Sequence, residues 1–300
     1  MANLKTLKTR IKSVRSTQKM TKAMKMVAAS RLKKAKNAVE LSRPYSDKIR
    51  EMIIELASNI SNRGNFSEQF PLLTGKSLSK TKTYLLLVVS SDRGLCGGLN
   101  SATVKYTKNR VNQLIAQGNL VKIYCVGKKA YEQLKTPYAD KIIKKDFGIF
   151  KTVITPKNAE QICDNIIGFF NENQFDVCEV IFSKFKSAIA QEQVCKQLIP
   201  AQIEFEFSEN SADKFESPIN YESSQEEILS ELLPKNISVQ LYNLLLENNA
   251  SEHGARMAAM ESATNNAGKM IKNLTLVYNR TRQANITKEL IDIISGANTV

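Results

Sequence analysis

The feature that most constrains this chain is an apolar heptad pattern that begins at Leu4 and continues for more than fifty residues. With Leu4 at position a, twelve of seventeen a and d positions are apolar, which is the periodicity of a coiled coil. One helix of that length would measure on the order of 80 Å at about 1.5 Å per residue. A globular domain of this size is narrower, so we expect the helix to project and to pair with another helix. The apolar positions are Leu4, Leu7, Ile11, Val14, Ala28, Leu32, Ala35, Val39, Ile49, Ile53, Leu56 and Ile60.

The pattern changes in the stretch QKMTKAMKMVAASRLKKAK, which begins at Gln18. The a and d positions Gln18, Thr21 and Lys25 are polar and break the apolar seam, while apolar side chains lie on several other faces. A methionine stripe is usually core, but a single partner helix could not bury all of these side chains. We therefore expect another protein to surround this stretch. The apolar side chains are those of Met20, Met24, Met26 and Val27.

A second long helical pattern follows Pro234 and continues to about residue 295. A proline ahead of such a pattern suggests a kink or the first turn of a helix rather than its end. The small residues Ala263 and Ala267 would let two helix axes approach closely. The simplest arrangement is a long antiparallel coiled coil formed by the N- and C-terminal helices.

Between the two helical patterns, strand and helix candidates alternate. The strand candidates are TYLLLVVSS, VKIYCVG and FDVCEVIFSKF, and such alternation predicts a doubly wound, mainly parallel sheet. The expected fold class is therefore α/β, with the coiled coil bracketing a Rossmann-like domain. We expect an N-terminal coiled-coil helix over residues 1–60, a connector over 61–82, the α/β domain over 83–203, an acidic joint over 204–233 and the C-terminal coiled-coil helix over 234–300.

The net charge of +14 is concentrated at one end of the chain. Residues 1–50 hold fifteen Lys and Arg but only Glu40 and Asp47 as acids, whereas residues 51–300 are nearly balanced. An acid-poor basic start also resembles an organellar transit peptide. Because the helical pattern continues without a break to about residue 60, we expect this segment to belong to the mature fold.

The loop SDRGLCGGLN, which begins at Ser91, raises the question of an active site. Its glycines fit neither a dinucleotide fingerprint nor a phosphate-binding loop. Cys96 would need an imidazole to become a nucleophile, and the only histidine of the chain is His253. We prefer a glycine-permitted turn at the end of a parallel strand, with Asp92 and Arg93 exposed for contact.

Two other classes of function each fit one part of the sequence. A DNA-binding coiled coil would explain the basic helix, but its basic residues lie around the whole helix, with methionines embedded among them. An enzyme built on the central domain would need a ligand, and a doubly wound fold does not establish one. The five cysteines are never spaced C-x-x-C, so we expect buried thiols rather than disulfides or a metal site.

Five stretches of the chain together resemble the gamma subunit of the rotary ATP synthases, the central stalk of that complex. They occur in the family's order and extend over the whole chain, and at one point Ser223 follows YE where proline is common. The stretches are IKSVRSTQKMTKAMKMVAASRLKKA, SDRGLCGGLN, INYESSQEEILSELLP, SEHGARMAAMESATNNAGKMI and LVYNRTRQANITKELIDIISGA.

The resemblance implies a non-catalytic rotor shaft that transmits torque between an ion-driven ring of membrane c subunits and a catalytic hexamer of alpha and beta subunits. It implies further contacts with the epsilon and delta subunits, and no cofactor, metal, nucleic acid or membrane insertion. Taken together with the absence of a removable leader, which we infer from the unbroken helical pattern, it implies a peripheral location on the cytoplasmic face of a bacterial plasma membrane. The matching residues are Met24, Lys25, Arg256, Arg282, Gln283, Thr287 and Glu289 toward the hexamer, Tyr221 and Glu222 toward the ring, and Asp92 and Arg93 in the contact loop.

Overall fold

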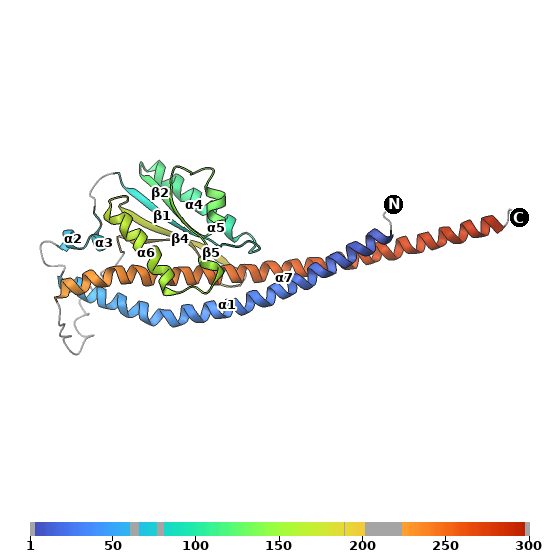
Figure 1. The fold of residues 1–300 in the computed structure, drawn as a ribbon, viewed down its shortest axis with the longest axis horizontal. Helices are drawn as coiled ribbons and strands as arrows, with labels where there is room; N and C mark the ends of the chain where they lie inside the picture. Colours follow the sequence, from blue (N-terminus) through green and yellow to red (C-terminus); the bar gives the residue numbers. More distant parts are fainter. Residues whose placement is uncertain (1–3, 61–65, 77–80, 189, 202–223, 298–300) are drawn as a thin grey trace. The chain divides into compact units, whose positions relative to one another are not determined.

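The computed structural model describes residues 4–60, 66–76, 81–188, 190–201 and 224–297. The chain divides into two compact units, residues 1–30 with 256–300 and residues 31–255. Two long helices contribute to both units, α1 (Leu4–Ile60) and α7 (Gln225–Ala297) (Figure 1). None of the helices described here carries an apolar stretch long enough for a bilayer crossing.

The second unit contains a five-stranded sheet with the strand order β3-β2-β1-β4-β5. The first four strands of the chain are mutually parallel where they pair, and β5 is antiparallel to β4. Both edge strands, β3 and β5, are additions to the three strands that the sequence predicts. The strands are β1 (Thr83–Val89), β2 (Leu120–Val126), β3 (Ile142–Asp146), β4 (Val177–Phe185) and β5 (Gln191–Ile199).

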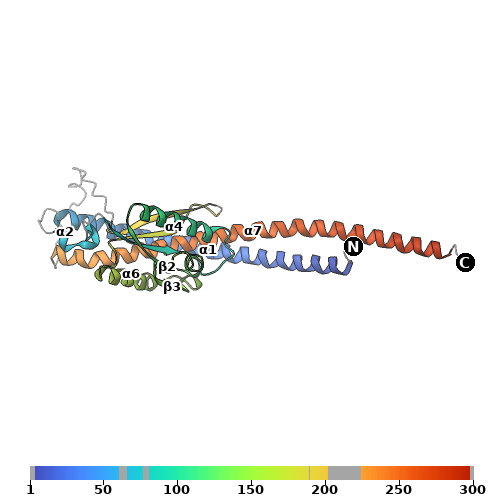
Figure 2. The same ribbon diagram turned by 90° about the horizontal axis from the view of Figure 1, so that it is seen from above.

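Helices cover both faces of the sheet. One face packs against α4 (Leu99–Ala116) and α5 (Lys128–Leu134), with Val111 and Leu134 fully buried. The other packs against α6 (Pro156–Asn171) and the part of α7 around Leu241 (Figures 1 and 2). This is a doubly wound, mainly parallel α/β fold, and the predicted fold class is confirmed. Short helices complete the second unit: α2 (Phe66–Gln69), α3 (Pro71–Thr74) and the 3-10 turn Ile149–Lys151.

Polar contacts attach α7 to the interior strand β4 within the second unit. The amide of Ser183 donates to Asn248 Oδ1 at 3.2 Å, and Ser251 Oγ donates to the carbonyl of Ser183 at 2.7 Å. All three side chains are buried. Buried polar groups cost free energy unless they are hydrogen-bonded, so these contacts favour one position of α7 on the strand.

Farther along the second unit, α1 and α7 pack against each other directly. Ile53 and Leu56 of α1 form a fully buried cluster with Leu229 and Leu233 of α7. The apolar heptad positions expected near residue 60 therefore do face a partner helix.

The start of α7 differs from the sequence expectation. The helix begins at Gln225, so residues 225–233 of the expected acidic joint are helical, and Pro234 lies inside the helix. Glu226 and Glu227 fall in the first turn, where negative side chains stabilise a helix by interacting with the positive end of its dipole. Pro44 likewise lies inside α1 rather than at an end.

Glycine is required where β2 meets α5. Gly127 has φ +100°, and a Cβ there would lie 2.1 Å from the carbonyl oxygen of Ser90. Gly118 also has a positive φ, of +80°, but a Cβ there would meet no atom within 4 Å. A substitution at either glycine strains the backbone, but only a substitution at Gly127 also produces a steric clash. Comparing the two positions therefore distinguishes the cost of strain from the cost of the clash.

Replacing Gly127 by alanine should lower the free energy of unfolding by about 3 kcal/mol or more, because strain and a backbone clash add. Gly118→Ala, the matched control, should cost only about 1 kcal/mol from strain. Urea unfolding followed by circular dichroism measures both. Equal losses in the two variants would contradict the close approach of Gly127 to Ser90.

Candidate functional site

In the first unit, α1 and α7 pair in antiparallel fashion. Thr21 Oγ1 lies 2.8 Å from Thr264 Oγ1, and farther along α1, Lys25 Nζ lies 2.5 Å from Oε1 of Glu261, which is earlier in α7. As residue numbers rise along α1 they fall along α7, which confirms the antiparallel coiled coil. Figure 2 shows the two segments running alongside each other.

Gln18, Thr21 and Lys25 were expected to break the seam, but they do not. Each makes a polar contact with α7: besides the pairs above, Gln18 Nε2 donates to the carbonyl of Thr264 at 3.5 Å. Thr21 is only 9% exposed, between the apolar layers of Leu7 and Ala28. The heptad therefore continues through this stretch as polar layers, because α7 supplies a partner for each side chain.

Apolar side chains point away from this seam. Met20, Met26 and Val27 are 62%, 59% and 54% exposed, and Met24 is half-buried. Large apolar side chains gathered on the outside of a helix pair are unusual in a protein that works alone. Of the residues expected to meet a partner here, Met24 borders this apolar surface, whereas the ammonium group of Lys25 is paired with Glu261 of α7 at a partly exposed position.

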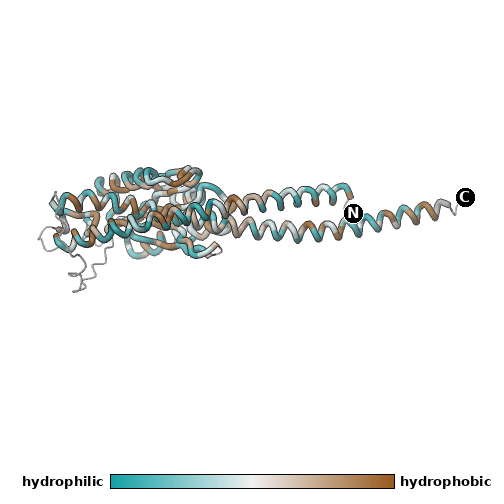
Figure 3. The backbone as a smooth tube through the Cα atoms, turned by 90° about the horizontal axis from the view of Figure 1, so that it is seen from below, coloured by the Kyte–Doolittle hydropathy of each residue, from teal (hydrophilic) through white to brown (hydrophobic). Residues whose placement is uncertain are grey.

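The far end of α7 exposes both polar and apolar side chains. Arg282, Gln283, Thr287 and Glu289 are all exposed, and Arg256, nearer the seam, is half-buried. Brown apolar positions recur between teal polar ones along this end of the helix (Figure 3). The exposed apolar residues are Ile286, Leu290, Ile291, Ile293 and Ile294, between 49% and 67% exposed.

The contact expected with the membrane ring falls on two residues of the acidic joint. Tyr221 and Glu222 lie outside the residues that the structure describes. Their proposed contact therefore rests on the sequence motif INYESSQEEILSELLP alone.

The loop after β1 corrects the expectation for Asp92. Its side chain was expected to be exposed but is 7% exposed, whereas Arg93 is exposed as expected. The Asp92 carboxylate accepts backbone N–H groups from Lys128 at 3.2 Å, Gly148 at 2.9 Å and Phe150 at 3.1 Å. The chain segments that follow β2 and β3 therefore converge on this one side chain, which makes it a structural anchor.

Cys96 has a packing role in the same loop. The thiol is 1% exposed, and Asn100 Nδ2 donates to its sulfur at 3.1 Å. Asn100 Oδ1 in turn accepts from the amide and hydroxyl of Ser91, so the loop is closed on itself. Gly97 has φ +60°, the conformation expected of a glycine-permitted turn between a strand and a helix.

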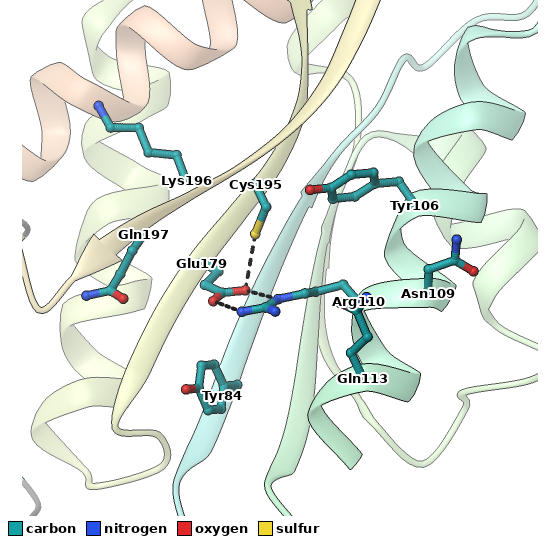
Figure 4. A pocket seen from close by; sticks show the side chains of 9 residues that line it. All are labelled: Tyr84, Tyr106, Asn109, Arg110, Gln113, Glu179, Cys195, Lys196 and Gln197. Atoms are coloured by element: carbon teal, nitrogen blue, oxygen red, sulfur yellow. Dashed lines mark hydrogen bonds and ion pairs between the residues drawn. The ribbon is translucent and has the colours of Figure 1, made fainter. Parts of the chain in front are cut away.

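A polar pocket of about 640 Å³ lies between α4 and the strands β1, β4 and β5 (Figure 4). Its centre is an ion pair in which Arg110 donates from Nε and Nη2 to both carboxylate oxygens of Glu179, at 2.8 and 2.5 Å. The hydrogen bond to Glu179 raises the pKa of Arg110. Tyr84, Tyr106, Asn109, Gln113, Cys195, Lys196 and Gln197 complete the lining.

The chemistry of this pocket does not favour a nucleophile. Burial, with the adjacent Glu179 carboxylate, raises the pKa of the Cys195 thiol to about 12, so the thiolate is scarce near neutral pH. Glu179 neutralises the guanidinium of Arg110, which leaves Lys196 as the other cationic side chain of the lining. Among the described residues, no group of three His, Cys, Asp or Glu is arranged to hold a metal ion.

Comparisons with known proteins decide the family. The family model described as ATP synthase matches residues 3–300. ATP synthase gamma chains of Azorhizobium caulinodans and Pelagibacter ubique are 45% and 46% identical to this chain, and each alignment covers both proteins completely. The chain belongs to the ATP synthase gamma-chain family.

Solved structures agree with the fold of a gamma chain. A chain of the Tetrahymena thermophila mitochondrial ATP synthase central stalk matches with a TM-score of 0.61 and 26% identity, over 81% of this chain and 99% of that one. A chain of the Euglena gracilis mitochondrial ATP synthase matches with a TM-score of 0.63 over 99% of this chain and 94% of that one, at 16% identity.

Membership in this family gives the described features a common context. A gamma chain is a non-catalytic subunit of ATP synthase, whose catalytic sites are on the beta subunits. The candidate functional site is therefore the exposed surface made of the outward residues of α1 and the far end of α7. The packed loop around Cys96 and the polar pocket belong to the α/β unit.

Asp92 and Arg93 of this gamma chain give a matched pair for a stability test. Asp92→Ala should lower the free energy of unfolding by about 3 kcal/mol, because three backbone N–H groups lose a charged acceptor. Arg93→Ala should change it by less than about 0.5 kcal/mol, as expected for an exposed side chain. Urea unfolding measures both free energies. An Asp92→Ala variant as stable as wild type would contradict the anchoring role of Asp92 and favour the exposed position expected from the sequence.

Proposed function

We propose that this chain is the central rotor shaft of a bacterial ATP synthase, turning inside a hexamer of alternating alpha and beta subunits. In this role it couples ion flow through a membrane ring to ATP synthesis or hydrolysis without making a covalent bond itself. The bacterial relatives support this role, since they are full-length gamma chains at about 45% identity. The central-stalk structure from Tetrahymena thermophila supports it as well.

The observation that carries the proposal is the exposed end of α7. Opposite Gln18, the helix has reached Gly268, so the α7 residues after about 282 continue past the start of α1. From Ile286 to Ile294, five isoleucine and leucine side chains are about half exposed or more. A single helix with apolar side chains on several faces needs a surrounding partner, which a hexamer of other subunits would provide.

The remaining parts have complementary proposed roles. The α/β domain and the joint that contains Tyr221 and Glu222 would form the foot that sits on the ring of c subunits and binds the epsilon and delta subunits. Exposed residues of the α/β domain, Arg93 included, would contribute contacts to the ring and to these subunits. We place the complex on the cytoplasmic face of a bacterial plasma membrane, where the gamma chain is a peripheral subunit. The five-segment division, at residues 60, 82, 203 and 233, is kept as the proposed functional division.

Polar residues at the end of α7 would hydrogen-bond to the surrounding subunits in particular rotational states. Arg282 offers N–H groups in a fixed fork that fits a carboxylate, and Gln283 offers both a donor and an acceptor. Thr287 and Glu289 follow on the same exposed helix end. Contacts that form in one rotary position and break in the next would favour one state over another without holding the complex together.

Met24→Lys tests the hexamer contact on α1. The new ammonium group would stand against neighbouring protein beside the Lys25–Glu261 pair, and an unpaired, partly desolvated cation costs several kcal/mol. Ion transport per ATP hydrolysed should fall severalfold, while the hydrolysis rate falls less. Met24→Leu, which preserves the apolar volume, should retain full coupling. Unchanged coupling in Met24→Lys would remove Met24 from the contact surface.

Replacing Arg282 and Gln283 together by alanine tests the far end. If the two side chains contribute about 1.4 kcal/mol to the transition between rotary states, multisite ATP turnover should fall about tenfold, with assembly intact. Asn279→Ala, at an exposed position of the same helix, is the control. Turnover equal to wild type at saturating ATP would mean that both side chains are merely solvated and that the shaft acts through its shape.

A further inference from the structure

Two side-chain stripes with helical spacing compete for the seam in one short part of α1. The polar stripe is formed by Gln18, Thr21 and Lys25, and each of its side chains contacts α7. The apolar stripe is formed by Met20, Met24 and Val27; Met20 and Val27 are more than half exposed, and Met24 between them is half-buried. Both stripes follow the three- and four-residue spacing that lets a helix face a partner.

The hydrophobic effect alone would favour the opposite arrangement. At about 100° per residue, the apolar stripe lies roughly a third of a turn around the helix from the polar stripe. Rotating this part of α1 about its own axis by that amount would bury the methionines against α7 and expose the polar side chains. The observed orientation therefore requires specific contacts that a rotated helix would lose.

Those contacts are concentrated on α7 between Glu261 and Gly268. Thr264 is central: its hydroxyl pairs with that of Thr21 at 2.8 Å, and its carbonyl accepts from Gln18. On one side, Lys25 and Glu261 form an ion pair at 2.5 Å. On the other side, a Cβ on Gly268 would lie 3.1 Å from Gln18 Nε2, so a glycine there leaves room for the amide in the seam.

We propose that the polar contacts of Gln18, Thr21 and Lys25 with α7 set the rotation of α1 about its axis and thereby hold the Met20–Met24–Val27 stripe outward. These residues are positioning residues, since they act through the stripe that they orient. Buried polar groups commonly specify one arrangement of a coiled coil at some cost in stability. That the outward stripe then meets the hexamer rests on the proposed function, whereas the setting of the rotation does not.

The test replaces Thr21 and Thr264 together by valine in the full-length chain, which removes both hydroxyls and retains both shapes. A Met20→Cys reporter, chosen because cysteine is a small apolar residue, is labelled with a maleimide. Labelling is measured peptide by peptide by mass spectrometry, which separates this site from the five native cysteines, all of which lie in the other unit. A second reporter, Lys12→Cys, at an exposed position outside the polar stretch, corrects for general reactivity.

In the valine pair, labelling at position 20 should slow at least threefold relative to position 12, with no fall in melting temperature. The serine pair, Thr21→Ser with Thr264→Ser, retains the hydroxyls and should label like the parent. An unchanged labelling rate in a folded valine pair would overturn the proposal.

If the valine pair does not fold, the ion pair gives an equivalent test. Glu261→Lys places two ammonium groups together and should slow labelling at position 20, while Lys25→Glu combined with Glu261→Lys should restore it. Failure of the double reversal to restore the rate would also overturn the proposal.

Coupling in the assembled complex separates this inference from the proposed function. Slower labelling together with impaired coupling supports both. Slower labelling with normal coupling would uphold the rotational setting and refute the contact between the stripe and the hexamer. Normal labelling in the valine pair, together with impaired coupling in Met24→Lys, would refute the rotational setting and uphold the contact between the stripe and the hexamer.

Discussion

The structure depends on one constraint: helices of 57 and 73 residues must each bury a face along most of their length. Isolated helices gain little stability in water, so tertiary packing has to supply it. In the second unit the sheet and the cluster around Ile53 and Leu233 provide that packing. Among the described residues of the first unit the two helices pack only on each other, and what they leave uncovered is the surface proposed to contact other subunits.

Polar groups carry much of the specificity in both units. Asp92 gathers three backbone amides at the ends of neighbouring strands, and Asn248 joins α7 to β4. Arg110 and Glu179 form a two-point ion pair under the polar pocket. In the first unit Thr21 meets Thr264 inside the seam. Apolar packing alone would tolerate several arrangements of these elements, whereas each of these groups has a partner in only one.

Membership in the gamma-chain family connects these features to mechanical work. A shaft that transmits torque has to be stiff, and it has to present different surfaces to its surroundings around its circumference. The outward methionines of α1 suit the second requirement, because they give one side of this helix an exposed apolar surface. The far end of α7 presents exposed apolar and polar side chains in alternation, which suits contact with a surrounding protein rather than with water.

The sequence by itself determined the two long helices, the alternating α/β core and the family, because heptad spacing, buried strands and motif order are local properties. It missed β3 and β5, since edge strands bearing Lys and Gln lack a continuous apolar run. Only the tertiary structure decided that Asp92 is buried and that Gln18, Thr21 and Lys25 belong in the seam. The physical reason is the same in each case: whether a polar side chain can be buried depends on the partner that a distant segment brings to it.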